Sequence, residues 1–196
     1  MYRLVESIKL QNRKLQNIEW HNKRFNETRN QLFGINEEVD LEQLIAVPDS
    51  LLNDVYKCRV LYGKQIEAVE FQLYTPKNVS TLQLVEGNDI AYAYKYENRF
   101  AFDRLMTMKG YADDILIVRD DHITDTSYSN IVFFDGKKWM TPDTFLLNGT
   151  QRQRLLAEGI ITEAKISPSE LKNFTAAKPI NAMLDFETTP LVSIFY

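Results

Sequence analysis

Short stretches that alternate apolar and polar residues, or are continuously apolar, recur along the chain and predict many β-strands. The predicted strands are residues 3–10, 15–18, 55–62, 66–74, 80–86, 113–119, 130–134, 138–141 and 181–186. A turn at residues 12–14 joins the first two strands, and Asp135-Gly136 favours a hairpin between the strands on either side of it.

Apolar residues at helical spacing predict helices between these strands. The longest predicted helix runs from Glu19 to Gly34, because a glycine is typical of the residue that ends a helix. Phe100, Leu105 and Met108 would share one side of another helix. The shorter helices are residues 40–45, 97–108 and 150–158, with a further helix start at residues 167–170.

Strands and helices in this mixture predict an α+β fold. The length of 196 residues fits one large domain or two small ones. A polar connection near residues 78–88 gives the most plausible division. We therefore predict a small N-terminal α+β domain over residues 1–83 and a larger C-terminal α+β domain over residues 84–196.

Composition and charge exclude several classes of protein. Hydrophobic residues make up 44% and charged residues 26%, which is typical of globular domains. The net charge of −4 argues against nucleic acid as a partner, because binding to phosphate backbones needs a basic excess. No apolar run reaches the roughly 20 residues of a membrane span, and the N-terminus lacks a signal pattern, so a cytoplasmic location is expected. Cys58 lies in a strand-like run, which predicts a buried core thiol.

Three features of the second half carry candidate chemistry. Lys95 offers an amine, Asp125 offers a carboxylate, and Gly149 leads a turn into a predicted helix. In that order they match what pyridoxal 5′-phosphate (PLP) requires: a Schiff base to a lysine, an acid at the pyridinium nitrogen, and backbone N–H groups for the phosphate. His21 and His122 are not at the spacing of metal ligands, so no metal site is predicted.

Each of these residues also has a simpler interpretation that stays open. Lys95 could be a solvated strand lysine, and Asp125 could cap a turn beside its two threonines. Arg24 could be a surface helix arginine, and Gly149 could serve only the turn. His21 is expected to pack or to form local hydrogen bonds.

Seven segments, in order along almost the whole chain, match one known family. They are Leu4–Lys9, His21–Phe25, Lys95–Arg99, Ala112–Leu116, Ile123–Ile131, Asn148–Arg152 and Asn181–Met183. On these residues the chain resembles the class IV aminotransferases, the fold-type IV enzymes that depend on PLP. The resemblance implies the two-domain α+β fold of D-amino-acid aminotransferases, in a shortened form. It also implies a homodimer and a cofactor that lies between the domains.

The resemblance further implies a role for each matched residue. Lys95 would form the Schiff base and act as the catalytic base. The other expected cofactor contacts are Arg24 and Gly149 at the phosphate, Asp125 at the pyridine nitrogen, Leu147 against the ring, Thr150 and Gln151 through backbone N–H groups, and Asn181.

Two departures from the family pattern are visible. Position 125 usually carries glutamate, whereas Asp125 is shorter by one methylene group. Many members have isoleucine and threonine after the glycine, so Thr150 and Gln151 are expected to lose a hydroxyl contact to the phosphate.

The motif details favour an aminodeoxychorismate lyase-like enzyme that releases 4-aminobenzoate and pyruvate. An aminotransferase for D- or branched-chain amino acids is the first alternative, and a non-catalytic descendant of the fold is the second. Arg59, Lys77 and Ser7 are candidates for contacts with the substrate carboxylate or for proton relay.

Overall fold

The computed structural model describes residues 3–195, which form two compact units. The first unit comprises the chain up to Pro76 together with Tyr94–Asn98, and the second unit comprises Lys77–Ala93 and the chain from Arg99 onward. This division differs from the predicted boundary between residues 83 and 84. It also assigns Lys95 to the first unit, because the chain around it pairs with the first strand.

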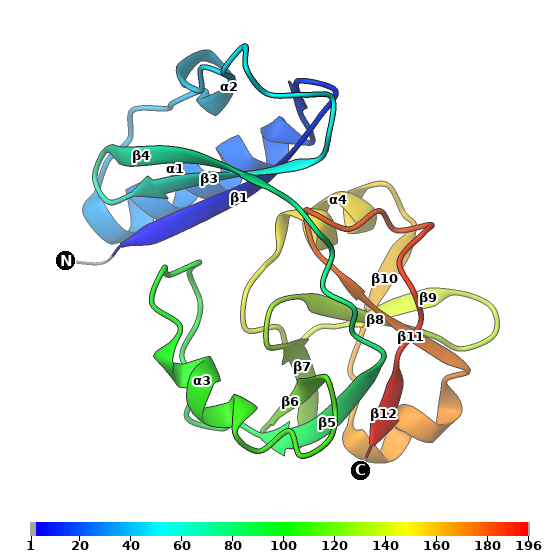
Figure 1. Cartoon of the computed structure of the whole chain (residues 1–196). Coiled ribbons are helices and arrows are strands. Elements are labelled where there is room, and N and C mark those ends of the chain that lie inside the picture. Colours follow the sequence, from blue (N-terminus) through cyan, green and yellow to red (C-terminus); the bar gives the residue numbers. More distant parts are fainter. Residues whose placement is uncertain (1–2, 196) are drawn as a thin grey trace. The chain divides into compact units, whose positions relative to one another are not determined.

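The first unit is an antiparallel sheet with a long helix (Figure 1). The strand order is β2-β1-β3-β4, with β1 at Leu4–Gln11, β2 at Lys14–Leu15, β3 at Tyr56–Tyr62 and β4 at Ile66–Leu73. Helix α1 spans Ile18–Phe33 and the short helix α2 spans Leu41–Leu44. These elements confirm the predicted strands and helices, although the return strand β2 is shorter than predicted. Gly34 ends α1 in the left-handed conformation, with φ at 68°, as the sequence indicated.

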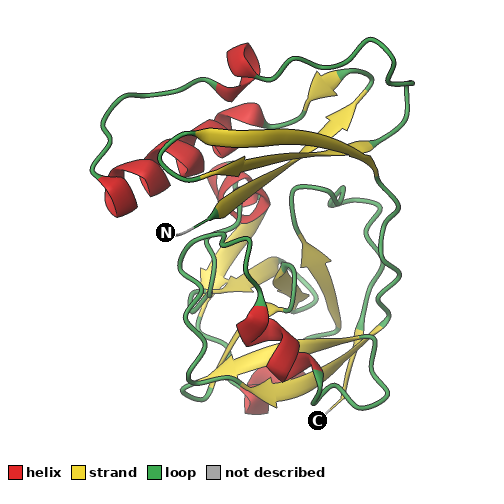
Figure 2. Ribbon diagram, turned by 60° about the vertical axis from the view of Figure 1, so that its left-hand side comes forward, coloured by secondary structure: helices red, strands yellow, loops and turns green. Residues whose placement is uncertain are grey.

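Helix α1 packs on one face of this sheet (Figure 2). Leu4 and Ile8 of β1 and Val60 of β3 meet Phe25 of the helix, and all four side chains are buried. Cys58 belongs to the same cluster and is fully buried, so the prediction of a core thiol is confirmed. Burial raises the pKa of its thiol to about 12.

The second unit contains two four-stranded sheets among the described residues. In the first sheet the order is β12-β5-β6-β7, with β12 at Ser193–Phe195, β5 at Thr81–Glu86, β6 at Asp114–Arg119 and β7 at His122–Thr126. In the second sheet the order is β10-β9-β8-β11, with β10 at Ile161–Ala164, β9 at Trp139–Pro142, β8 at Asn130–Phe134 and β11 at Ala176–Ile180. The remaining elements are α3 at Phe100–Met106, α4 at Thr150–Ala157 and a 3-10 helix at Pro168–Asn173.

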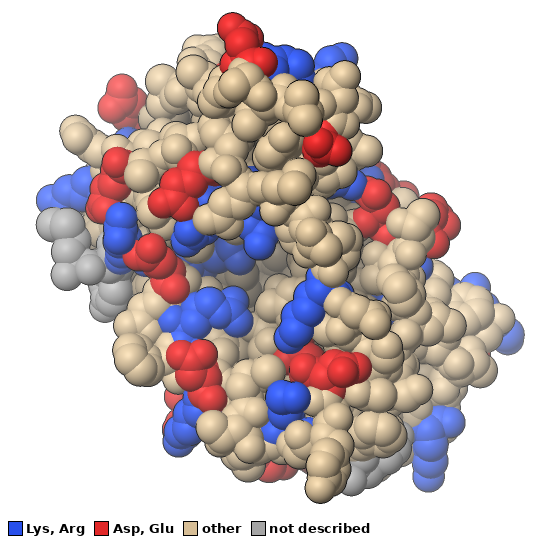
Figure 3. Space-filling model, in the orientation of Figure 1, with Lys and Arg blue, Asp and Glu red and all other residues tan. Residues whose placement is uncertain are grey.

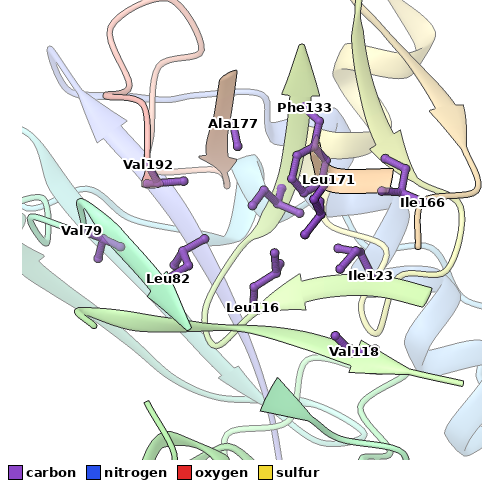
Figure 4. Packing of buried hydrophobic residues seen from close by; sticks show 11 residues of the cluster. Val79, Leu82, Leu116, Val118, Ile123, Phe133, Ile166, Leu171, Ala177 and Val192 are labelled. Atoms are coloured by element: carbon purple, nitrogen blue, oxygen red, sulfur yellow. The ribbon is translucent and has the colours of Figure 1, made fainter. Parts of the chain in front are cut away.

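The core of the second unit joins its two sheets (Figure 4). Leu82, Leu116 and Ile123 come from the first sheet, and Phe133 and Ala177 come from the second, and their side chains point toward one another. On the second sheet, Val132 and Ile180 also belong to a smaller buried cluster that contains Leu155 of α4. Helix α4 is therefore anchored to strands β8 and β11, which fixes where its N-terminus lies.

Three expectations about secondary structure were wrong. Residues 181–186 form a turn, because the Asn181 backbone and side-chain oxygens accept hydrogen bonds from the N–H groups of Leu184 and Met183. Strands β7, β10, β11 and β12 were not predicted. Of the residues predicted to share the buried side of α3, Leu105 is buried, but Phe100 and Met108 are exposed by 78% and 53%, and Phe102 is buried with Leu105 in their place.

Charged side chains of both signs are intermixed on the face drawn in Figure 3. Within residues 3–195, no helix combines the length and apolar character that crossing a membrane requires.

Candidate functional site

Lys95 is held by backbone pairing with the first strand. The Val5 N–H donates to the Lys95 carbonyl oxygen at 3.0 Å, and the Glu97 N–H donates to the Arg3 carbonyl oxygen at 2.9 Å. Strand β3 covers one edge of β1 along its length, so this segment extends the other edge, beyond the short pairing with β2. The lysine side chain is half-buried. Backbone hydrogen bonds on either side of Tyr96 therefore fix the position from which the lysine amine extends.

A buried carboxylate, Glu6, holds two basic residues of α1. It lies on β1 between Leu4 and Ile8, on the face that the helix covers. Arg24 binds it with two hydrogen bonds, from Nε to Oε1 at 2.9 Å and from Nη2 to Oε2 at 2.6 Å. His21 Nδ1 lies 2.6 Å from Oε2. The guanidinium of Arg24 is thus oriented by a residue that the sequence analysis did not identify.

The ionisation of this cluster follows from its burial and its charges. Burial alone would raise the pKa of Glu6, but the charge of Arg24 and the hydrogen bonds from His21 and Arg24 outweigh it and lower the pKa from 4.5 to about 2. Burial lowers the pKa of His21, and the positive charges of Arg24 and Lys95 lower it further, against the opposing effect of Glu6. Glu6 is therefore ionised and His21 neutral at pH 7.

A neutral His21 beside an ionised Glu6 carries its proton on Nδ1 and donates it to the carboxylate. Its Nε2 is then a buried acceptor that has no hydrogen-bond partner among the described residues. The expectation of local hydrogen bonding for His21 is confirmed.

In the second unit, Asp125 near the end of β7 is held by three N–H donors. The backbone N–H groups of Leu146 and Leu147 donate to Oδ2 at 3.1 and 3.0 Å, and Asn130 Nδ2 donates to Oδ1 at 2.8 Å. A carboxylate offers about four acceptor positions, so roughly one remains for a further donor. Burial raises the pKa of Asp125 from 3.8 to about 6, although the three hydrogen bonds oppose this shift.

The N-terminus of α4 follows the same loop. Gly149 is its N-cap, and no side chain caps the helix. The backbone N–H groups of the first turn are therefore available to an anion, which the helix dipole also favours. Thr150 and Gln151 are buried, and Gln151 Oε1 accepts a hydrogen bond from Arg154 Nε at 3.3 Å. The backbone N–H of Gln151 belongs to this first turn.

The buried side chain of Arg152 holds the loop between β9 and α4 in place. It is 2% exposed, and its Nη2 donates to the Pro142 carbonyl oxygen at 3.1 Å and to Glu163 Oε1 at 2.5 Å. Its guanidinium also stacks on the Phe145 ring, with 4.3 Å between the guanidinium carbon and the ring centroid. These contacts fix the segment that carries the N–H groups bound to Asp125.

The structure brings most of the predicted site residues together within the second unit. Asp125, Leu147 and Gly149 meet through Asn130, and Thr150 and Gln151 follow directly. Asn181 comes one residue after Ile180, whose strand partner is Asn130. Arg24 and Lys95 belong to the first unit, which is described separately.

The sequence analysis did not identify two residues that the structure places at the candidate site. Glu6 interrupts the otherwise apolar face of a predicted strand, and that interruption was the available signal. Asn130 was noted only as part of a matching segment, and nothing local indicated that its side chain reaches the loop before α4.

The profile of the amino-transferase class IV family matches residues 92–193, so the chain belongs to the class IV aminotransferase family. It is 38% identical to an uncharacterized protein of Haemophilus influenzae over 93% of this chain and 98% of that protein. Among solved structures, it is similar to a Haemophilus somnus protein provisionally named 4-amino-4-deoxychorismate lyase. The TM-score is 0.87 with 28% identity, over 93% of this chain and 97% of that one.

A more distant structure of the same fold is the PLP-bound form of a hypothetical aminotransferase from Mycobacterium tuberculosis. Its TM-score is 0.75 with 15% identity, over 98% of this chain and 81% of that one. These matches confirm the expected fold class, a mixed helix and sheet protein of fold type IV.

The class IV aminotransferases depend on PLP, and groups of the second unit fit that cofactor. An acid with one acceptor position left suits a pyridinium nitrogen, and an uncapped helix N-terminus behind a glycine suits a phosphate. In the first unit, described by itself, Lys95 carries an amine and Arg24 carries a cation whose orientation is fixed by Glu6.

Proposed function

We propose that this protein binds PLP and acts at the Cα of an amino-acid substrate, with aminodeoxychorismate lyase as the first candidate activity. The observation that carries the proposal is the buried Asp125, which is linked by hydrogen bonds to the loop that opens α4. One connected structure thus provides an acid and an anion-binding helix N-terminus.

PLP, when bound, withdraws electrons from the substrate Cα. Asp125 would hold a proton at the ring nitrogen, because a buried carboxylate with an acceptor position left is stabilised by a positive partner. The N–H groups of Thr150 and Gln151 would bind the phosphate, and Arg24 would balance its charge. Lys95 would hold the cofactor through its aldehyde, and its amine would move the substrate Cα proton.

The lyase assignment is supported by two observations. The Haemophilus somnus structure, which is similar over nearly the full length of both chains, carries that name provisionally. The segment Lys95–Arg99 also follows the pattern of the lyase branch. An aminotransferase would use the same residues up to removal of the Cα proton, so the alternative remains a D- or branched-chain aminotransferase.

The family likeness further favours a homodimer. A molecular mass of two chains in analytical sedimentation would support the homodimer, and a mass of one chain would contradict it.

Incubation with PLP, reduction with borohydride and peptide mass spectrometry test the cofactor and its lysine together. We expect an absorbance band near the visible edge that borohydride removes, and a mass increment on the peptide that contains Lys95. Lys95→Ala should abolish both the increment and turnover, whereas the matched control Lys57→Ala, at another partly buried lysine, should retain both. A wild-type protein that is colourless after excess PLP has been added and then dialysed away would support the non-catalytic alternative.

A substrate panel then separates the activities. Aminodeoxychorismate is tested beside D- and L-amino acids, with and without a 2-oxo acid acceptor. Pyruvate released without an acceptor identifies the lyase, and turnover that requires the acceptor identifies an aminotransferase.

A further inference from the structure

Asn130 makes three contacts that the proposed function does not by itself explain. It is the first residue of β8 and is 6% exposed. Its Nδ2 donates both to Asp125 Oδ1 at 2.8 Å and to the Leu147 carbonyl oxygen at 2.8 Å. One amide group therefore joins the acid of β7 to the loop that precedes α4.

The third contact explains why position 149 is glycine. Gly149 has φ at −66° and ψ at 145°, a conformation that any residue can adopt. A Cβ there would lie 2.1 Å from Asn130 Oδ1 and 3.3 Å from its Cγ. The glycine is thus required by space rather than by backbone conformation. Asn130 and Gly149 form an interlocked pair.

The loop before α4 also contacts Asp125 directly, at the other carboxylate oxygen. The N–H groups of Leu146 and Leu147 bind Asp125 Oδ2, while Asn130 binds Oδ1 and the Leu147 carbonyl oxygen. The carboxylate and the loop are therefore joined both directly and through Asn130. A shift of the α4 N-terminus relative to Asp125 would break several of these bonds at once.

We propose that Asn130 is a positioning residue that sets the distance between the Asp125 carboxylate and the N-terminus of α4. This inference rests on the proposed function, since that distance matters to a ligand that engages both ends, as PLP would. The side chain must be an amide of this length. Aspartate would place a second carboxylate against Asp125, and alanine would leave the loop carbonyl and the carboxylate without their shared donor.

A double-mutant cycle in the protein without cofactor tests the interlock. Gly149→Ala in the wild-type background should lower the urea midpoint of the second unit, because its methyl group collides with Asn130. In the Asn130→Ala background the same substitution should cause little further loss, because the collision is gone. Equal losses in the two backgrounds would overturn the interlock.

A pH titration of Asp125 in the protein without cofactor tests its connection to Asn130. The chemical shift of the Asp125 carboxyl carbon is followed against pH, and its midpoint gives the pKa. Asn130→Ala should raise the midpoint, because it removes a donor that favours the charged form. The control Asn173→Ala, at an exposed asparagine elsewhere in the second unit, should leave the midpoint unchanged. A midpoint unmoved by Asn130→Ala would contradict the proposal.

PLP binding separates this inference from the proposed function. If the wild-type protein binds PLP, Asn130→Ala should weaken its affinity about tenfold or more, as loss of a hydrogen bond to a charged group does. Affinity equal to that of the wild type would refute the positioning role. If the wild-type protein binds no PLP, the proposed function fails, whereas the cycle and the titration still decide the connection between Asn130, Asp125 and Gly149.

Discussion

Replacement of Glu6 by glutamine should strongly destabilise the first unit. The substitution keeps the size of the side chain but removes its charge, so Arg24, which is buried, loses its counter-ion. The pKa of Glu6 falls from 4.5 to about 2 in the folded protein, a difference that corresponds to roughly 3 kcal/mol of stability. Loss of one partner of a buried pair costs about 3–5 kcal/mol in other proteins, which agrees with this value.

The pH dependence of this loss has a definite sign. Because the pKa of Glu6 is lowered on folding, its stabilising contribution is fully present above pH 4.5 and is lost as the pH falls toward about 2. The difference in unfolding free energy between the wild type and Glu6→Gln should therefore be largest at neutral pH and shrink between pH 4.5 and pH 2.

The assay uses the two tryptophans of the chain, since Trp20 lies in the first unit and Trp139 in the second. In a Trp139→Phe background, the fluorescence of Trp20 during urea denaturation reports the first unit. The control is Glu70→Gln, which breaks a partly exposed pair with Arg59 on the same sheet and should cost less than about 1 kcal/mol. If Glu6→Gln costs no more than Glu70→Gln, the buried cluster does not stabilise the unit as argued.

Three further predictions concern the buried groups of both units. The difference in unfolding free energy between Asp125→Asn and the wild type, measured on the cofactor-free second unit, should shift in favour of the variant by up to roughly 3 kcal/mol between pH 3.8 and pH 8, because the raised pKa of Asp125 means that its ionised form is disfavoured by folding. Most of this shift should occur as the pH passes through about 6, and a difference that does not change with pH would contradict it. Leu116→Ala should cost about 2–5 kcal/mol in denaturant unfolding, because Leu116 is fully buried between the two sheets of the second unit, and a loss below 1 kcal/mol would mean that the core is not packed as described. Cys58 should react slowly with iodoacetamide in the native protein and quickly in urea, because the thiol is buried and its pKa is raised, and equal rates would show that the first unit opens readily.

The local sequence determined the elements that depend on near neighbours. The strand from Leu4 and the helix that ends at Gly34 follow from hydrophobic period and from a glycine at a left-handed position. The start of α4 at Thr150 follows from the residues that flank it. The family motifs likewise indicated Asp125 and Gly149, because these residues lie in short segments whose spacing is regular.

Tertiary structure decided what depends on distant partners. Glu6 became the counter-ion of Arg24 only because a helix packs on the strand that carries it, and Asn130 reached the loop before α4 only because β8 lies beside β7. Strand β12 exists because it pairs with β5, although the two are more than a hundred residues apart in the sequence. Hydrogen bonds and charge pairs between such distant residues leave no periodic pattern, so a sequence can indicate the chemistry of a residue without showing which partner holds it in place.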